Sequence, residues 1–465
     1  MQAALDWLQK NHESIIHNLA DLVAIPSIST DGEHGDEIER TATMTCRQMR
    51  EAGLQNVEVL KVGNSLPYAY GEWLDAPGKP TVFLYAHHDV QPINFVDQWL
   101  SDPWKLTRRD GRLFGRGSAD DKAAISAQLG AVSAYLHANE PLPVNIKMLV
   151  EGEEEVGSKN LMQFFDRHKK KLQSDVIIVC DTENIEVGLP SITYSLRGIV
   201  TALVEVQSAT IPVHSGTGGG ALADAAIALN VILSKLFWDN GPLPIPGYYE
   251  GVRPLTEKER AAFRKLPGDD SQWRSDCGVL PGVRLAVEKG FTAYEQTTRR
   301  PAVTVIAQEA SSIKGASNQV LPKASALVSC RIVPDQKPED VFQQLKSHLT
   351  QDPPWGVQVS VKDAGSVNWW MTDPNGPAFE AAMGALRQGF GRDPVAIGSG
   401  GSIGFVGPLA ELFGGAPALL LGIEDPASNA HAPNESLHEG DFKKLMASLV
   451  MLFENLGKLT PKTVK

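Results

Sequence analysis

The stretch TVFLYAHHD at residues 81–89 decides the expected fold, because a short apolar and β-branched run passes directly into two histidines and an aspartate. Such a run is typical of a strand buried on both faces of a parallel sheet. Two similar runs follow, VNIKMLV (144–150) and DVIIVC (175–180), and helical segments at 119–138 and 158–171 separate the three. Alternating strands and helices predict an α/β fold with a mostly parallel sheet sandwiched by helices.

The pattern changes after residue 194 and returns near residue 377. Residues 192–208 and 301–333 alternate apolar and polar side chains like half-exposed strands, with a helical segment at 221–237 between them. This arrangement predicts a separate α+β module. We therefore expect a discontinuous domain of residues 1–194 and 372–465, interrupted by an inserted domain of residues 195–371.

Composition limits the class of protein. The chain has 465 residues, of which 42% are hydrophobic, and a net charge of −12. A general nucleic-acid binder needs a basic surface, so we expect no nucleic-acid partner. The sequence contains no apolar run of the roughly 20 residues that cross a bilayer, so we expect no membrane partner. Four widely spaced cysteines and an opening segment unlike a signal peptide favour a cytoplasmic location.

Acidic and histidine side chains lie where the predicted strands end. The carboxyl ends of parallel strands meet at one edge of an open sheet, so these side chains should lie together. Crowded carboxylates repel one another, and a bound cation would relieve that repulsion. The candidate residues are His87, His88, Asp89, Asp120, Glu151, Glu153, Glu154, Glu155, Asp181 and His431.

The ligand types favour zinc, manganese or cobalt, because imidazole and carboxylate together suit these ions better than calcium or magnesium. Five candidate ligands exceed what one open catalytic zinc needs, so a bridging carboxylate could hold two ions roughly 3.5–4 Å apart. Such a pair generates hydroxide near neutral pH. The adjacent Glu154 and Glu155 would allow one carboxylate to bind metal while the other acts as general base.

Other interpretations of the same residues stay open. Asp120 and Asp121 could cap the following helix, and residues 151–158 could be a solvated turn. A phosphate-binding loop at 115–122 is disfavoured by its two acids, and a serine-hydrolase elbow does not fit residues 398–402. A glycosidase carboxylate pair would leave the histidines without a role.

Six segments, in this order along the chain, resemble the M20 metallopeptidases, most closely the branch of cytosolic non-specific dipeptidase and carnosinase. The resemblance covers nearly the whole chain and implies a di-metal catalytic domain (residues 1–194 and 372–465) with an inserted lid and dimerisation domain (195–371). The segments are AHHDVQP (86–92), GRGSADDK (115–122), EGEEEVGS (151–158), VCD (179–181), VHSGTGGG (213–220) and NAHAPNE (429–435).

The resemblance also implies a role for each matching residue. One metal ion would be bound by His87 and Asp181, and the other by Glu155 and His431. Asp120 would bridge the two ions and carry a cis peptide bond to Asp121. The catalytic residues would be Glu154 as general base, Asp89 as the partner that orients His87, and His214 as the group that polarises the scissile carbonyl.

The substrate carboxylate would be held by Asn318, Arg331 and Ser402. The loop that carries Ser402 departs from the dipeptidase pattern Arg-Glu-Gly-Gly-Ser, because Gly398 and Ser399 replace the charged pair. This departure bears on recognition of the C-terminal side of the substrate.

The function implied is a di-metal hydrolase that cleaves dipeptides or short peptides with a free carboxylate. A metal-bridging hydroxide would attack the carbonyl, with Glu154 as general base. The cofactors would be two divalent ions per chain, zinc first, with manganese or cobalt as alternatives, and the chain would form a homodimer through the lid. Two alternatives are an N-acyl amino acid deacylase or carboxypeptidase on the same scaffold, and a non-catalytic metal- or peptide-binding protein.

Overall fold

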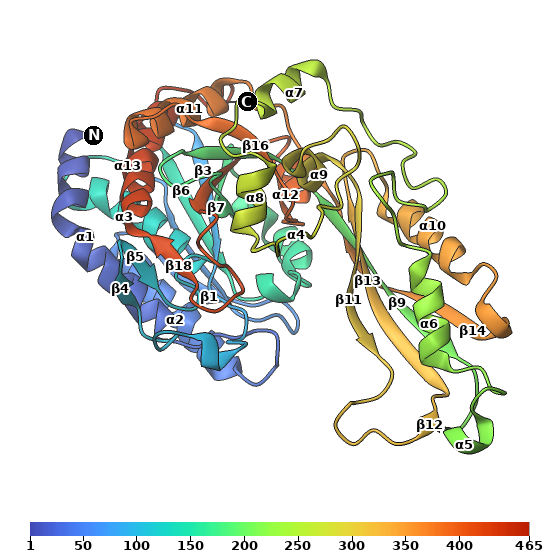
Figure 1. The fold of residues 1–465 in the computed structure, drawn as a ribbon. Coiled ribbons are helices and arrows are strands. Elements are labelled where there is room, and N and C mark those ends of the chain that lie inside the picture. The colour runs from blue at the N-terminus through green and yellow to red at the C-terminus, as the bar shows by residue number, and fades with distance from the viewer. Residues whose placement is uncertain (465) are drawn as a thin grey trace. The chain divides into compact units, whose positions relative to one another are not determined.

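The computed structural model describes residues 1–464, which form two compact units (Figure 1). The first unit contains Met1–Tyr194, Thr372–Ile397 and the residues from Phe405 onward. The second contains Ser195–Met371 and the short segment Gly398–Gly404. Among the helices of residues 1–464, none has both the length and the apolar character needed to cross a bilayer.

The larger sheet has nine strands in the order β1-β2-β6-β3-β7-β17-β8-β15, with β16 paired to β8. Most of this sheet belongs to the first unit, whereas β15 and the last residues of β8 and β16 lie within the bounds of the second. The four central strands of the sheet are parallel: β6 (Asn145–Glu151), β3 (Thr81–His87), β7 (Val176–Glu183) and β17 (Ala418–Glu424). The prediction of a mostly parallel central sheet is therefore confirmed. The flanking strands are β1 (Gln55–Leu60), β2 (Tyr68–Trp73), β8 (Ser191–Leu196), β15 (Trp370–Met371) and β16 (Val395–Ser399).

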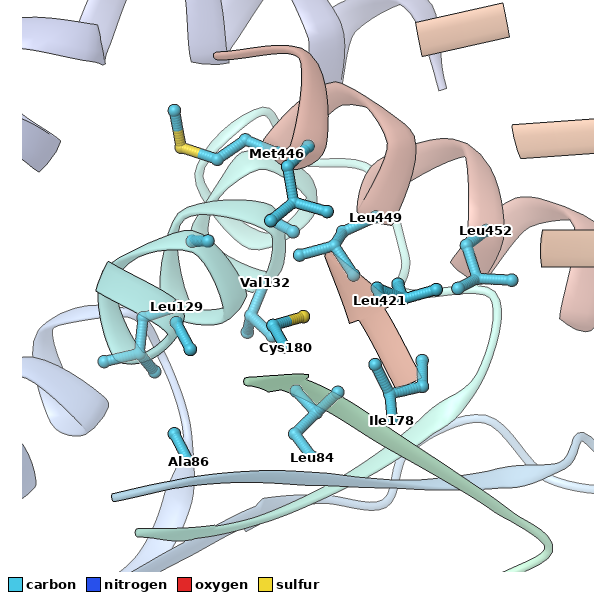
Figure 2. Close-up of a cluster of buried hydrophobic side chains, with 14 of the residues drawn as sticks. Leu84, Ala86, Leu129, Val132, Ile178, Cys180, Leu421, Met446, Leu449 and Leu452 are labelled. Carbon is cyan, nitrogen blue, oxygen red and sulfur yellow. The ribbon is translucent and has the colours of Figure 1, made fainter. Parts of the chain in front are cut away.

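Helices cover both faces of this sheet. Leu84, Ile178 and Leu421 pack on one face against α3 and α13 (Figure 2). On the other face, Phe83 contacts Phe413 and Tyr85 contacts Phe405, with ring centroids 5.4 and 4.1 Å apart. The helices of this unit are α1 (Gln2–Val23), α2 (Gly35–Glu51), α3 (Lys122–His137), α4 (Leu161–Leu172), α11 (Pro377–Phe390), α12 (Val406–Leu412) and α13 (Glu439–Leu456).

The alternation of side chains along each strand determines to which face of the sheet the last residues of the strand point. Ala86 and Cys180 belong to the core cluster packed on α3 and α13. Successive side chains in a strand point to opposite faces, so His87 and Asp181, the next residues along, point to the other face. Two polar side chains from neighbouring strands thus share one face at one edge of the sheet.

The second unit is an antiparallel sheet with helices on one face. Its strand order is β11 (Ala302–Glu309), β13 (Lys323–Ile332), β9 (Gly198–Gln207) and β14 (Gln358–Val367). Alternate residues of β9 are buried, and they form a core with α6 (Ala225–Ser234) and α10 (Pro338–Thr350). The smaller elements are β10 (Val213–His214), α5 (Ser215–Gly218), α7 (Glu257–Phe263), α8 (Asp270–Asp276), α9 (Ala293–Arg299) and β12 (Gln319–Val320).

The structure differs from the sequence interpretation at the point where the chain leaves the first unit. The segment 192–208, interpreted as one strand region, is divided at Arg197 into β8 and β9, which belong to different sheets. A side chain at Gly198 would meet the Val367 carbonyl oxygen at 2.5 Å, so the close approach requires glycine. Gly398–Gly404 joins the second unit, where the Gly398 N–H donates to the Tyr294 hydroxyl at 2.9 Å.

A small sheet and three short 3₁₀ turns complete the fold. The sheet pairs β18 (Ser436–His438) with β5 (Arg112–Phe114), and β5 with β4 (Thr107–Arg109). This pairing brings the segment after His431 beside the segment before Asp120. The 3₁₀ turns are Val96–Gln98, Glu154–Val156 and Pro354–Gly356.

Candidate metal centre

Five predicted ligand residues lie together at the carboxyl edge of the central sheet, and all belong to the first unit. They form two groups: His87, Asp120 and Asp181 make one, and Asp120, Glu155 and His431 make the other. Within each group the candidate ligand atoms all lie within 4.8 Å of one another. The two groups share Asp120.

The two oxygens of Asp120 face different imidazoles. Its Oδ1 lies 3.0 Å from His87 Nε2, and its Oδ2 lies 2.9 Å from His431 Nε2. Asp181 Oδ1 is 4.0 Å from the same nitrogen of His87, and Glu155 Oε2 is 3.3 Å from that of His431. One carboxylate therefore stands between two sets of nitrogen and oxygen donors, as a bridging ligand would.

Glu435 holds the loop that carries Asp120. Its buried carboxylate accepts hydrogen bonds from the backbone N–H groups of Gly117, Ala119 and Asp120, at 2.9, 2.9 and 3.1 Å. It also forms an ion pair with the buried Arg116. Because three N–H groups converge on one carboxylate, the loop has one well-defined conformation, and the Asp120 side chain has a fixed origin.

The Asp121 side chain binds the end of β3 and does not cap α3. The peptide bond between Asp120 and Asp121 is cis. Asp121 occupies the N-cap position of α3, but its side chain makes no capping hydrogen bond there. Instead its Oδ2 accepts the backbone N–H of His87 at 3.1 Å. The helix-cap interpretation of these two acids therefore does not describe what they do.

Asp89 joins His87 to the turn that carries Glu154 and Glu155. His87 Nδ1 lies 3.5 Å from Asp89 Oδ1 and 3.0 Å from the Asp89 carbonyl oxygen. The same buried carboxylate accepts the backbone N–H groups of Glu154 and Glu155 at 3.2 and 3.0 Å, and the Ser29 hydroxyl at 2.7 Å. Asp89 thus positions members of both groups.

The remaining acids of the run 151–155 have structural partners. Glu153 is buried and accepts the Tyr68 hydroxyl at 2.7 Å and the Asn160 N–H at 2.8 Å. Glu151 accepts the Tyr85 hydroxyl at 2.6 Å. His88 is also buried, with Nε2 3.0 Å from the Pro67 carbonyl oxygen, and burial lowers its pKa to about 4. These contacts leave Glu154 and Glu155 as the acids that face the centre.

The centre has an excess of negative charge. Burial, and then the nearby Asp121, raise the pKa of Asp181 well above its usual range. Burial and the neighbouring Glu155 raise the pKa of Glu154 to about 8. Hydrogen bonds to Asp120 and Glu155 raise the pKa of His431 to about 11, so the imidazole is drawn toward its charged form. The repulsion between these acids and the shift of His431 reflect crowded carboxylates, whose charge divalent cations on oxygen and nitrogen donors would offset. The donor set therefore fits two such ions.

The second unit contains two pairs of predicted residues. His214 is exposed and its Nδ1 accepts the Gly216 N–H at 3.0 Å, so the neutral ring carries its hydrogen on Nε2. The Ser215 N–H donates to the Asn318 carbonyl oxygen at 2.9 Å, which holds Asn318 beside His214. Arg331 Nη1 donates to the Ser402 hydroxyl at 2.9 Å.

Arg197 lies next to the second pair. The Ser402 hydroxyl donates to its carbonyl oxygen. Its own side chain is 8% exposed and donates to the carbonyl oxygens of Gly400 and Arg300, at 3.2 and 3.4 Å. Burial, and then the charge of Arg331, lower the pKa of Arg197 to about 10. Within residues 1–464 neither guanidinium has an acidic partner, so together they favour an anion.

Sequence reasoning missed the supporting residues Ser29, Gln91, Arg116, Arg197 and Glu435. Three of these lie inside the segments that carry the resemblance: Gln91 in 86–92, Arg116 in 115–122 and Glu435 in 429–435. Gln91 Nε2 donates to Glu155 Oε2 at 2.7 Å. No spacing pattern links Ser29 to Asp89, because their contact joins segments 60 residues apart.

The chain is similar to known proteins over nearly its whole length. Residues 83–455 match the family model described as Peptidase family M20/M25/M40. A cysteinylglycine-S-conjugate dipeptidase of Corynebacterium striatum is 32% identical, and the match covers 97% of each chain. Human carnosine dipeptidase 1 has a similar structure, with a TM-score of 0.86 at 26% identity over 98% of this chain and 99% of that one. The dipeptidase Dug1p of Saccharomyces cerevisiae shares the fold, with a TM-score of 0.87 at 23% identity over 98% of each chain.

Because Glu435 holds the loop that carries Asp120, we predict that substituting Glu435 weakens metal binding although its side chain is not a proposed ligand. Glu435→Gln keeps the shape of the side chain but removes the charge that accepts three N–H groups and pairs with Arg116. Loss of such a supporting contact should weaken metal binding about 10- to 100-fold. The measurement is the zinc affinity of the purified variant in competition with a chelator.

The control for this variant is Glu411→Gln, which changes an exposed glutamate on α12 and should leave zinc affinity unaltered. Circular dichroism of both variants checks that they fold. Wild-type zinc affinity in a folded Glu435→Gln variant would contradict the positioning role of Glu435.

Proposed function

The chain belongs to peptidase family M20/M25/M40 and is a metallopeptidase of the dipeptidase type, and on this premise we propose that it hydrolyses dipeptides or short peptides with a free carboxylate. The observation that carries the proposal is the placement of Asp120 between His87 and His431, at 3.0 and 2.9 Å. The relative from Corynebacterium striatum is a dipeptidase by name, which supports a dipeptide as substrate.

We propose that His87 and Asp181 hold one divalent ion, that Glu155 and His431 hold the other, and that Asp120 binds both. Zinc is our first choice, with manganese or cobalt as alternatives. When bound, such ions supply an activated water and polarise the scissile carbonyl.

Glu154 would act as the general base. It would accept a proton from the attacking water and deliver it to the nitrogen of the leaving amine, so that the carbonyl carbon keeps the oxygen while its bond to nitrogen breaks. The hydrogen bonds from the Glu154 and Glu155 N–H groups to Asp89 support this division of roles, because one buried carboxylate fixes the backbone of both residues.

The residues of the second unit would recognise the substrate. We propose that the Nε2–H of His214 donates to the scissile carbonyl oxygen, a role supported by the Gly216 N–H on its other nitrogen. Asn318, Arg331 and Ser402 would hold the substrate carboxylate. The absence of an acidic partner for Arg331 and Arg197 within residues 1–464 supports an anionic ligand there.

A substrate panel after metal removal tests the proposed function. The protein is stripped with a chelator, and zinc, manganese or cobalt is restored one at a time. We expect turnover of free dipeptides to be lost on stripping and regained with at least one of these ions. Cleavage of acetyl- or succinyl-amino acids alone would indicate the deacylase alternative, and release of C-terminal residues from longer peptides alone would indicate the carboxypeptidase alternative.

The variant Glu154→Gln tests the base. Removing a general base should lower kcat by about 10²–10⁴-fold, while metal content and dipeptide binding stay near wild type. The matched control is Glu153→Gln, an adjacent glutamate with structural partners, which should affect stability more than kcat at a temperature where it is folded. Full activity of the Glu154→Gln variant would overturn the assignment.

We also propose that the chain forms a homodimer through the second unit. Ile227 and Val231, one turn apart on α6, are 54% and 44% exposed, and Val305 and Ile306 on the edge strand β11 are 41% and 56% exposed. The Gln308 amide of β11 donates to Asn230 Oδ1 of α6 at 2.8 Å, so these apolar side chains belong to neighbouring elements. An apolar surface beside an open strand edge suits a second copy of the same surface.

Sedimentation at several concentrations should show a dimer that Ile227→Asp shifts toward monomer. The control Leu280→Asp changes an equally apolar residue, 70% exposed, outside α6 and β11, and should leave the dimer intact. A wild-type protein that sediments only as a monomer would contradict the proposal.

We also propose that the protein resides in the cytoplasm. Cys46, Cys180 and Cys330 are buried thiols, which fits a reducing compartment. Fractionation of the source cells tests this point, and recovery of the protein outside the cytoplasmic fraction would contradict it.

A further inference from the structure

Glu424, the last residue of β17, is a buried carboxylate without a partner. Its side chain is 8% exposed, and within residues 1–464 no group donates a hydrogen bond to it or forms an ion pair with it. Its backbone is fixed, because the Asn184 N–H donates to its carbonyl oxygen at 2.8 Å. Buried acids are nearly always paired, so this one calls for an explanation.

The side chain of Glu424 points to the same face of the sheet as Asp181. Leu419, Leu421 and Ile423 belong to the core on the α3 and α13 face, as Leu421 in Figure 2 illustrates. Alternation along β17 therefore turns Glu424 to the opposite face. On the neighbouring parallel strand β7, Cys180 belongs to the same core and Asp181 follows it.

Glu424 is nevertheless not one of the candidate metal ligands. It belongs to neither group of ligand atoms, although Asp120 and Asp181 are among the charges that act on it most strongly. It thus adds a buried carboxyl group beside the centre, outside both donor sets.

Three basic side chains at this edge face other acids. Arg112 donates to both oxygens of Asp425 at 3.1 and 2.9 Å, and Arg116 pairs with Glu435. His431 faces Asp120 and Glu155. The protein therefore leaves Glu424 to a cation that comes from outside the chain.

We propose that Glu424 receives the free ammonium group at the N-terminal end of the substrate. This inference rests on the proposed function and specifies the feature by which the substrate is recognised, a free N-terminal ammonium group. The ammonium of a dipeptide is attached to the carbon next to the scissile carbonyl, so it must lie close to the centre that acts on that carbonyl. An N-acylated amino acid or peptide has no positive charge at this position and gains nothing from Glu424. Glu424 is thus a specificity residue that favours dipeptides over acylated substrates.

The test measures binding rather than turnover. Calorimetry on the zinc-loaded Glu154→Gln protein, in which turnover should be much slower, compares cysteinylglycine with N-acetyl-cysteinylglycine. We expect the free dipeptide to bind more tightly. Adding Glu424→Gln should weaken its binding about 10- to 100-fold, the value of a hydrogen bond to a charged group, and leave binding of the acetylated peptide unchanged.

Two further variants keep the test decisive. Glu411→Gln alters an exposed acid on α12 and should change neither affinity, and Glu424→Asp should retain the preference for the free amine. Equal loss for both peptides, no loss for either, or loss of zinc from the Glu424→Gln protein would overturn the proposal. A wild-type protein that binds free dipeptides selectively but does not cleave them would refute the proposed function and leave this inference standing.

Discussion

The position of Asp120 between two imidazoles is the constraint on which the site depends. Its oxygens lie 3.0 Å from His87 and 2.9 Å from His431, so one side chain belongs to both donor groups. The neighbouring contacts fix this position. Glu435 accepts the backbone N–H groups of Ala119 and Asp120, and Asp121 accepts the backbone N–H of His87. The sheet contributes by ending neighbouring parallel strands at one edge, which concentrates negative charge where cations can offset it.

The charges of the two units correspond to the two ends of a dipeptide. The first unit offers Glu424 and an acidic centre, and the second offers Arg197 and Arg331 without acidic partners. A dipeptide carries an ammonium group at one end and a carboxylate at the other. Each unit, taken by itself, offers the charge that one of these ends would need.

The sequence predicted the central sheet, and the placement of acids and histidines at its edge, because both leave local signals; the resemblance then selected the five proposed ligands among them. Runs such as 81–86 and 175–180 are too apolar and too short for anything but buried strands, and the polar residues that follow them mark the sheet edge. Contacts between segments far apart in the chain have no local sequence pattern, so the sequence did not predict them. The bond from Ser29 to Asp89, the turn of the chain at Arg197, and the transfer of Gly398–Gly404 to the second unit all depend on tertiary packing.

The most direct test of the account is the location of the metal ions in crystals of the zinc-loaded protein, by anomalous scattering at the zinc edge. The account predicts two peaks about 3.5–4 Å apart, one beside each oxygen of Asp120. A single peak, or a pair of peaks that Asp120 does not touch, would contradict it.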